Sequence, residues 1–288
     1  MREHAVTIDG IDVHVQHGGR GRPVLFVHGL GGASTSWQPH LEALAENRRV
    51  IAPDLPGFGR SAKPEAAFTP AFFVDVLVDL LDQLGVDETD LVASSMGGQV
   101  AIELALRHPD RVRRAVAIAP AGVPPARFEG TPELARYRDI VHAETEEEVT
   151  RVLEAVRPDE LPPPEHGRDP AEILAYVHDP GAERAFQRAL TASAEARRLG
   201  PLLDDVEAPL WIVWGTRDPM IPWDVAGPVV QQATSPGLIT VEGAGHSPHN
   251  EDLATFQPLL EAILAGEVSA SVPAEEVQIR SVPAEHRG

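Results

Sequence analysis

The chain has 288 residues, of which 43% are hydrophobic, so it can build one large core or a core with a lid. Its formal net charge of −20 argues against binding to nucleic acid or to anionic membrane surfaces. The absence of cysteine excludes disulfides, thiolate catalysis and cysteine metal sites, and Lys63 is the single candidate for amine chemistry.

The N-terminal segment carries charges without the apolar stretch of a secretion signal, and the chain has no run of about 18 apolar residues. We therefore expect a cytoplasmic protein with no membrane-spanning segment. We interpret the predominance of arginine over lysine as a result of the codon usage of a GC-rich bacterial source.

Residues 5–16 alternate apolar and polar side chains around Asp9 and Gly10, which predicts a hairpin.

Between residues 23 and 119 the chain alternates three times between short apolar runs and segments of helical spacing. This alternation is typical of an α/β protein with a mostly parallel sheet and helices on both faces. Ligands of such sheets bind beyond the carboxyl ends of the strands. The predicted strands are residues 23–27, 49–53, 91–93 and 111–119, and the predicted helices are residues 37–45, 70–84 and 99–107.

Proline punctuation and charged, helix-prone segments without strand signals follow, which predicts a helical cap. The strand and helix pattern then resumes, and the last residues repeat SVPAE without a core pattern, so we expect a disordered tail. The predicted organisation is an α/β core in two parts, residues 1–119 and 206–265, a cap over residues 120–205 and a tail over residues 266–288.

A short apolar run leads through a turn of serines and glycines into a helical pattern, and a serine at the tip of such a turn exposes its hydroxyl. The position two residues after the tip is crowded, because strand and helix backbones nearly touch there. Ser95 places Gly97 at that position, whereas Ser94 places Met96 there, so Ser95 is preferred. Ala93 stands where the G-x-S-x-G motif has its first glycine, which weakens the match by one methyl group.

Glycine-rich and turn-forming sequences follow the first two predicted strands of this alternation. HGLGG at residues 28–32 can present backbone N–H groups to an oxyanion, or it can serve as a flexible turn. DLPGFGRS at residues 54–61 has the composition of a turn, in which we expect Asp54 to accept hydrogen bonds from backbone amides. His28 is expected to bond backbone atoms rather than to act as a base.

A nucleophilic serine needs a base to accept its proton and an acid to orient that base. Asp218 and His246 each lie just beyond a predicted strand, and the chain order is Ser, Asp, His. The orienting acid could also lie just after the predicted strand at residues 111–119, but no acid follows that strand before Glu129, which leaves Asp218 nearly unopposed. His249 is a rival of His246, but glycines flank His246. No third ligand set accompanies these two histidines, so we expect no metal site.

At this point the chain resembles the α/β hydrolase superfamily over residues 5–265. The matching strings are HGLGG at 28–32, DLPGFGRS at 54–61, SSMGG at 94–98, WGTRDPMIP at 214–222 and GAGHSPHNE at 243–251. The resemblance implies an α/β-hydrolase fold in which Ser95 is the nucleophile, His246 the general base and later acid, and Asp218 the group that orients His246. It also implies that the backbone N–H groups of Leu30 and Met96 form the oxyanion hole.

The resemblance implies a hydrolase of a carboxylic ester or lactone, acting through an acyl-enzyme on a small, mostly apolar substrate, without a cofactor and as a possible homo-oligomer. One alternative is a carbon–carbon bond hydrolase of meta-cleavage diketo products. Such enzymes share SSMGG but commonly carry tryptophan after the catalytic histidine, where this chain has Ser247. Another alternative is a small-molecule receptor or near-inactive binder on the same fold.

The substrate pocket is expected at the carboxyl ends of the strands, under the cap. Three cap arginines are candidates to recognise a substrate carboxylate, with solvated surface charge as the alternative: Arg127, Arg136 and Arg138. The candidate pocket residues are Gly29, Trp37, Ser94, Met220, Ile221 and Ser247.

Overall fold

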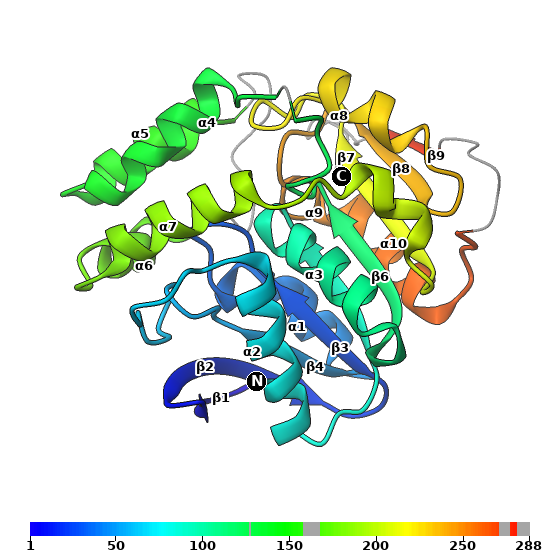
Figure 1. Cartoon of the computed structure of the whole chain (residues 1–288), viewed down its shortest axis with the longest axis horizontal. Helices are drawn as coiled ribbons and strands as arrows, with labels where there is room; N and C mark the ends of the chain where they lie inside the picture. The colour runs from blue at the N-terminus through cyan, green and yellow to red at the C-terminus, as the bar shows by residue number, and fades with distance from the viewer. Residues whose placement is uncertain (127, 158–167, 271–276, 281–288) are drawn as a thin grey trace.

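The computed structural model describes residues 1–126, 128–157 and 168–270, together with the backbone of residues 277–280 (Figure 1). Within these residues one sheet has the strand order β1-β2-β4-β3-β5-β6-β7-β8-β9. Neighbouring strands from β4 to β9 are parallel, whereas β1–β2 and β2–β4 are antiparallel. The strands are β1 (Arg2–Ile8), β2 (Ile11–Gly19), β3 (Pro23–Val27), β4 (Arg49–Pro53), β5 (Thr89–Ser94), β6 (Val112–Ile118), β7 (Leu210–Gly215), β8 (Gly237–Glu242) and β9 (Val277–Arg280).

The predicted N-terminal hairpin is confirmed as β1 and β2, which are joined at Asp9 and Gly10. Both turn residues have positive φ angles, +46° and +79°. Two-residue hairpin turns of this kind match the right-handed twist of the strands, and aspartate followed by glycine tolerates them well. These two residues therefore supply the backbone conformation that the hairpin turn requires.

Helices cover both faces of the sheet, as the alternating pattern predicts. One face is covered by α1 and α10, whose Leu41 and Leu260 are fully buried in the same apolar cluster. The other face is covered by α2, α3 and α8, which belong to a larger cluster that continues into the cap. The helices of this core are η1 (Ser34–Trp37), α1 (Gln38–Leu44), α2 (Pro70–Gln83), α3 (Met96–Arg107), η2 (Pro109–Arg111), α8 (Trp223–Val230), α9 (Pro248–Glu251) and α10 (Leu253–Ala265).

The segment between β6 and β7, for which the sequence predicts helices, contains helices and, in its described residues, no strand. We call residues 120–205 the cap. Figure 1 shows α4 to α7 gathered on one side of the molecule. Of these helices, α7 contacts α3 through a hydrogen bond from Nε2 of Gln99 to Ser193 O at 3.1 Å. The cap helices are α4 (Pro132–Tyr137), η3 (Arg138–His142), α5 (Glu146–Ala155), α6 (Pro170–Val177), α7 (Ala182–Glu195) and η4 (Gly200–Asp205).

The expectation of a tail without structure after residue 265 is wrong for residues 277–280. These residues form β9, which pairs in parallel with β8 from Ile239 to Glu242. The sequence VQIR alternates apolar and polar residues, and β8 would otherwise expose unpaired backbone groups along the edge of the sheet. Residues 271–276 and 281–288 lie outside the described part of the chain.

The described helices include none that is long and apolar enough to cross a lipid bilayer.

Candidate active site

Ser95 occupies a strained turn between β5 and α3. Its φ of +53° and ψ of −120° lie outside the regions that residues other than glycine usually adopt. Three backbone hydrogen bonds hold this conformation: the Ser95 N–H donates to Ile118 O at 2.8 Å, and the Ser95 carbonyl accepts from Gln99 at 3.1 Å and from Ala121 at 3.0 Å. The side chain lines the cavity described below. Such strain beside a cavity makes Ser95 a candidate functional residue.

The crowding expected two residues after the tip is found at Gly97. A Cβ atom there would lie 2.4 Å from Val27 O and 2.5 Å from His28 O, which is closer than carbon and oxygen can approach. Ala93, by contrast, is fully buried in β5, and its neighbours in register are Val27 and Ala117. The strand therefore accepts the methyl group that stands in place of the first motif glycine.

Asp218 and His246 meet at the carboxyl ends of β7 and β8. Nδ1 of His246 donates a hydrogen bond to Oδ2 of Asp218 at 2.7 Å. The other carboxylate oxygen accepts from the backbone N–H groups of Met220 at 2.8 Å and Ile221 at 2.9 Å. These bonds hold the Asp218 side chain in place, and they leave Nε2 of His246 as the nitrogen that can accept a proton.

The environment of His246 raises its pKa above the usual 6.5 of histidine. Burial alone would lower it, because a buried imidazolium is poorly solvated. The charge and hydrogen bond of Asp218 and the charge of Glu251 outweigh that effect. His249 behaves differently: burial, with His40 and His246 nearby, holds its pKa well below the usual value. His246, bonded to Asp218, is therefore the histidine built to take up a proton.

Glu251 is a candidate site residue that the sequence analysis missed. It lies at the end of the short helix α9, and its two oxygens accept hydrogen bonds from the backbone N–H groups of Gly245 at 2.5 Å and Ser247 at 3.0 Å. These residues flank His246, so one carboxylate holds the loop on both sides of the imidazole. Burial raises the pKa of Glu251, and the two backbone hydrogen bonds oppose that shift.

The loop after β3 packs directly against the serine. A Cβ atom on Gly29 would lie 3.1 Å from Cβ of Ser95, so any larger residue there would push the Ser95 side chain by a few tenths of an ångström. His28 binds backbone atoms, as expected: its Nδ1 lies 2.8 Å from Gly29 O, and its Nε2 accepts from the Leu55 N–H at 2.9 Å. The bond from Leu55 leaves Nδ1 as the donor. His28 is thus a structural residue of the loop.

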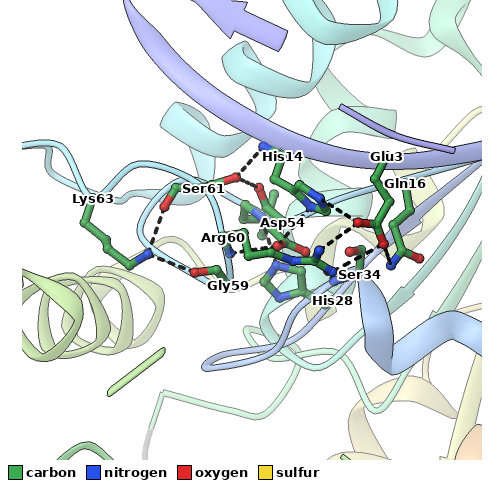
Figure 2. Close-up of polar contacts among 11 residues, drawn as sticks. Glu3, His14, Gln16, His28, Ser34, Asp54, Gly59, Arg60, Ser61 and Lys63 are labelled. Carbon is green, nitrogen blue, oxygen red and sulfur yellow. Dashed lines mark hydrogen bonds and ion pairs between the residues drawn. The ribbon is translucent and has the colours of Figure 1, made fainter. Parts of the chain in front are cut away.

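Asp54 binds the loop after β3 from the core side, and Figure 2 shows the network of polar contacts around its carboxylate. Its carboxylate accepts hydrogen bonds from the backbone N–H groups of Ser34 at 2.6 Å and Arg60 at 2.8 Å, and it lies 3.3 Å from Nδ1 of His14. The expectation that Asp54 bonds backbone amides is confirmed. Burial would raise the pKa of Asp54, but the imidazole of His14 close by and the hydrogen bonds from Ser34 and Arg60 hold it well below its usual range.

A cavity of about 450 Å³ lies between the cap and the carboxyl ends of the strands. Its lining includes Ser95, His246 and both residues expected to supply oxyanion donors, Leu30 and Met96. The cap contributes apolar side chains such as Leu134, so the cavity is closed by core and cap together. The candidate pocket residues that line it are Gly29, Ser94, Met220, Ile221 and Ser247.

The prediction of Trp37 as a pocket residue is wrong. Trp37 is fully buried and does not line the cavity. Its ring stacks on His249 with 4.7 Å between ring centroids, and it packs beside Phe26 of β3. Its neighbour along the helical face, Leu41, is buried in the same cluster, so this face turns towards the sheet rather than the site.

The cap arginines divide between the cavity and the surface. Arg138 lines the cavity, whereas Arg136 lies 3.8 Å from Glu133 in an exposed pair. Arg127 lies outside the described residues. Three further arginines line the cavity: Arg157, Arg168 and Arg198. Among the described residues no group of three or more His, Asp or Glu side chains is placed to hold a metal ion.

Comparison with known proteins agrees with this architecture. A family model described as alpha/beta hydrolase fold matches residues 22–253. An uncharacterized protein of Mycobacterium tuberculosis is 30% identical over 273 residues, which cover 90% of this chain and 80% of that protein. The 2-hydroxymuconate semialdehyde hydrolase of Pseudomonas sp. strain CF600 is 43% identical over 118 residues, 40% of this chain and 42% of that protein. The crystal structure of a bacterial membrane phospholipase A superposes with a TM-score of 0.74 and 27% identity, covering 92% of this chain and 86% of that one.

Proposed function

This chain belongs to the α/β hydrolase fold family, and on that basis we propose that it is a serine hydrolase that cleaves a carboxylic ester or lactone of a small, mostly apolar molecule. The observation that carries the proposal is the 2.7 Å hydrogen bond between His246 and Asp218, in a site whose cavity the strained Ser95 also lines. A nucleophile, a base and an orienting acid in this arrangement are the parts that acyl transfer requires.

In the proposed reaction Oγ of Ser95 attacks the substrate carbonyl carbon while its proton passes to Nε2 of His246. The carbonyl oxygen becomes an oxyanion, which the N–H groups of Leu30 and Met96 bind, each donor contributing about 3 kcal/mol. Collapse of this intermediate expels the alcohol, which takes the proton from His246, and leaves an acyl-enzyme. Water then attacks with His246 as base, and Ser95 recovers its proton as the acid departs. Asp218 stabilises the imidazolium in both halves.

The size of the cavity supports a small-molecule substrate. Its volume of about 450 Å³ falls in the range that small ligands occupy, roughly 300–1,000 Å³. Apolar cap residues such as Leu134 and Leu153 line it together with Ser95 and His246. In the proposed enzyme the cap excludes water from the acyl-enzyme and selects the substrate by shape.

The second candidate is hydrolysis of a carbon–carbon bond in a meta-cleavage diketo product. The 43% identity to a 2-hydroxymuconate semialdehyde hydrolase over part of the chain favours it, and arginines such as Arg138 are available in the cavity for a substrate carboxylate. We rank it second because Ser247 follows the histidine, where such enzymes commonly carry tryptophan. The likeness to a phospholipase over 92% of the chain favours ester chemistry.

The test is the intact mass of the protein after exposure to a fluorophosphonate, which traps an activated serine. Wild type should gain one adduct and Ser95→Ala none, while the control Ser94→Ala should still be labelled. Turnover on a panel of p-nitrophenyl esters and lactones should fall by about 10⁴ to 10⁶ in Ser95→Ala.

The same panel, extended by a meta-cleavage dienoate, separates the candidates. A meta-cleavage dienoate hydrolysed faster than every ester would establish the second candidate. Folded wild type that is neither labelled nor active on either class would refute the enzyme and leave a receptor or binder on this fold.

A further inference from the structure

Two cap side chains donate hydrogen bonds to the loop that carries Leu30. The hydroxyl of Tyr137, at the end of α4, donates to Leu30 O at 2.9 Å. The guanidinium of Arg168, which precedes α6, donates to Gly31 O, and its other terminal nitrogen donates to the Tyr137 hydroxyl at 2.6 Å. Two successive carbonyls of the loop are therefore bound by a joined pair of cap residues.

Packing reinforces these hydrogen bonds. Gly31 has a φ of +66°, and a Cβ atom on it would lie 3.0 Å from both the Tyr137 hydroxyl and Cε2 of Phe186. Tyr137 is buried, and Phe186 of α7 is fully buried with its ring centroid 6.0 Å from that of Tyr137. The cap thus meets the loop at a close contact to which α4, α7 and Arg168 all contribute.

The loop needs such support because it is rich in glycine. Gly29, Gly31 and Gly32 have access to many backbone conformations, and only a narrow range of them directs the Leu30 N–H at an oxyanion formed on Ser95. A hydrogen bond to a carbonyl fixes the orientation of its peptide plane. The planes fixed here, Leu30–Gly31 and Gly31–Gly32, directly follow the plane that carries the Leu30 N–H, so they limit how far that N–H can turn away from the site. A displacement of about 1 Å in a catalytic group can reduce the rate about 100-fold.

We propose that Tyr137 and Arg168 are positioning residues of the oxyanion hole, so that the cap assembles the catalytic site as well as covering it. The inference rests on the proposed function, since it concerns the donor at Leu30. Both residues also line the cavity, so a substrate that fills the space beside them stabilises the same contact. Binding energy from the part of the substrate under the cap then increases kcat rather than only lowering KM.

The test compares Tyr137→Phe and Arg168→Gln with the control Tyr176→Phe. Tyr176 lies in the same cap, does not line the cavity, and bonds Ala182 O at 3.3 Å instead of the loop. For each variant we would measure kcat and KM on p-nitrophenyl butyrate and the Ki of an aryl trifluoromethyl ketone, whose serine adduct carries an oxyanion. Thermal unfolding monitors the fold. Each of the two test variants removes one of the two bonds to the loop, and both remove the bond between Arg168 and the Tyr137 hydroxyl.

For Tyr137→Phe and Arg168→Gln we expect kcat to fall about tenfold or more with KM within about twofold, and Ki to rise by the same factor as kcat falls. Tyr176→Phe should leave both quantities at wild-type values. Unchanged kcat and Ki in folded test variants, or a higher KM with kcat retained, would overturn the positioning role and leave the serine hydrolase standing. Wild type that neither turns over esters nor is labelled at Ser95 would overturn both proposals.

Discussion

The buried carboxylate of Asp54 accepts a hydrogen bond of 2.6 Å from the backbone N–H of Ser34, and so joins the loop after β4 to the loop after β3. The loop of residues 28–34 is therefore bound from two sides. Asp54 binds it on the core side, while Tyr137 and Arg168 bind its carbonyls on the cap side (Figure 2 shows the core side).

Replacement of Asp54 by alanine should destabilise the protein. The N–H groups of Ser34 and Arg60 would lose their partner, at a cost of about 1–3 kcal/mol for each one that stays buried. The pKa of Asp54 is held below its usual range, so this stabilisation is complete above the unfolded pKa of about 3.9 and declines as acid protonates the carboxylate. Urea unfolding at pH 7 measures the loss. The control Asp12→Ala removes an exposed carboxylate that accepts a hydrogen bond from the Thr7 hydroxyl and should change stability by less than about 0.5 kcal/mol.

Gly97→Ala should abolish most of the activity. The new Cβ would lie 2.4 Å from Val27 O, so the start of α3 must move away from β3 and displace Ser95 and Met96. We expect kcat/KM to fall about 100-fold or more. Gly85→Ala is the comparison: it meets no atom within 4 Å but has a φ of +63°, so it should cost about 1 kcal/mol of stability and no activity. Equal activity in the two variants would contradict this account of the turn.

The pH dependence should show His246 as a base with a raised pKa. Activity requires the neutral imidazole, so the rate should decline on the acid side with a midpoint above 6.5. Glu251→Gln removes one of the two negative charges beside His246, Asp218 remaining, and should move that midpoint to lower pH. It should also reduce kcat about 10-fold to 100-fold, because the amide keeps one acceptor oxygen and places its NH2 group against the other backbone N–H, so the loop beside the imidazole loses one of its two bonds. If Glu251→Gln left the midpoint of the pH–rate profile unchanged and lowered only the stability of the protein, Glu251 would have a structural role alone.

Asp90 offers a prediction about stability away from the site. It is fully buried at the start of β5, bonded to Arg113, with Arg48 at 3.7 Å and Arg114 at 3.4 Å. Asp90→Asn leaves three guanidinium groups together without the negative charge, which should cost about 3–5 kcal/mol. The exposed pair of Asp75 with Arg107 is the control, and Asp75→Asn should cost about 0–1 kcal/mol. Chemical denaturation at pH 7 distinguishes them.

The local features were predictable because short-range chemistry decides them. The Asp9–Gly10 hairpin follows from the backbone freedom of its two residues, and the choice of Ser95 over Ser94 follows from the space that only Gly97 leaves. The hydrogen bonds that the Asp54 carboxylate accepts from backbone N–H groups follow in the same way from its place at the start of a turn. In each case the partners lie within a few residues or at the end of a neighbouring strand.

Other features depend on which elements meet in space. Trp37 has the periodicity of a helix face, and periodicity does not say whether that face turns to the sheet or to the cavity. Glu251 is one of two adjacent acids: Asp252 caps α10 through Thr255, and only the folded loop shows that its neighbour bonds Gly245 and Ser247.

The sequence by itself therefore determined the α/β alternation, the turn at Ser95 and the chain order of Ser95, Asp218 and His246, because hydrophobic period, glycine placement and strand ends are local properties. Only the tertiary structure decided that the hydroxyl of Tyr137 reaches Leu30 across 107 positions of the chain, and that the edge of β8 pairs with residues near the C-terminus. Such contacts depend on how the cap and the sheet edge pack, and no spacing in the sequence encodes that distance.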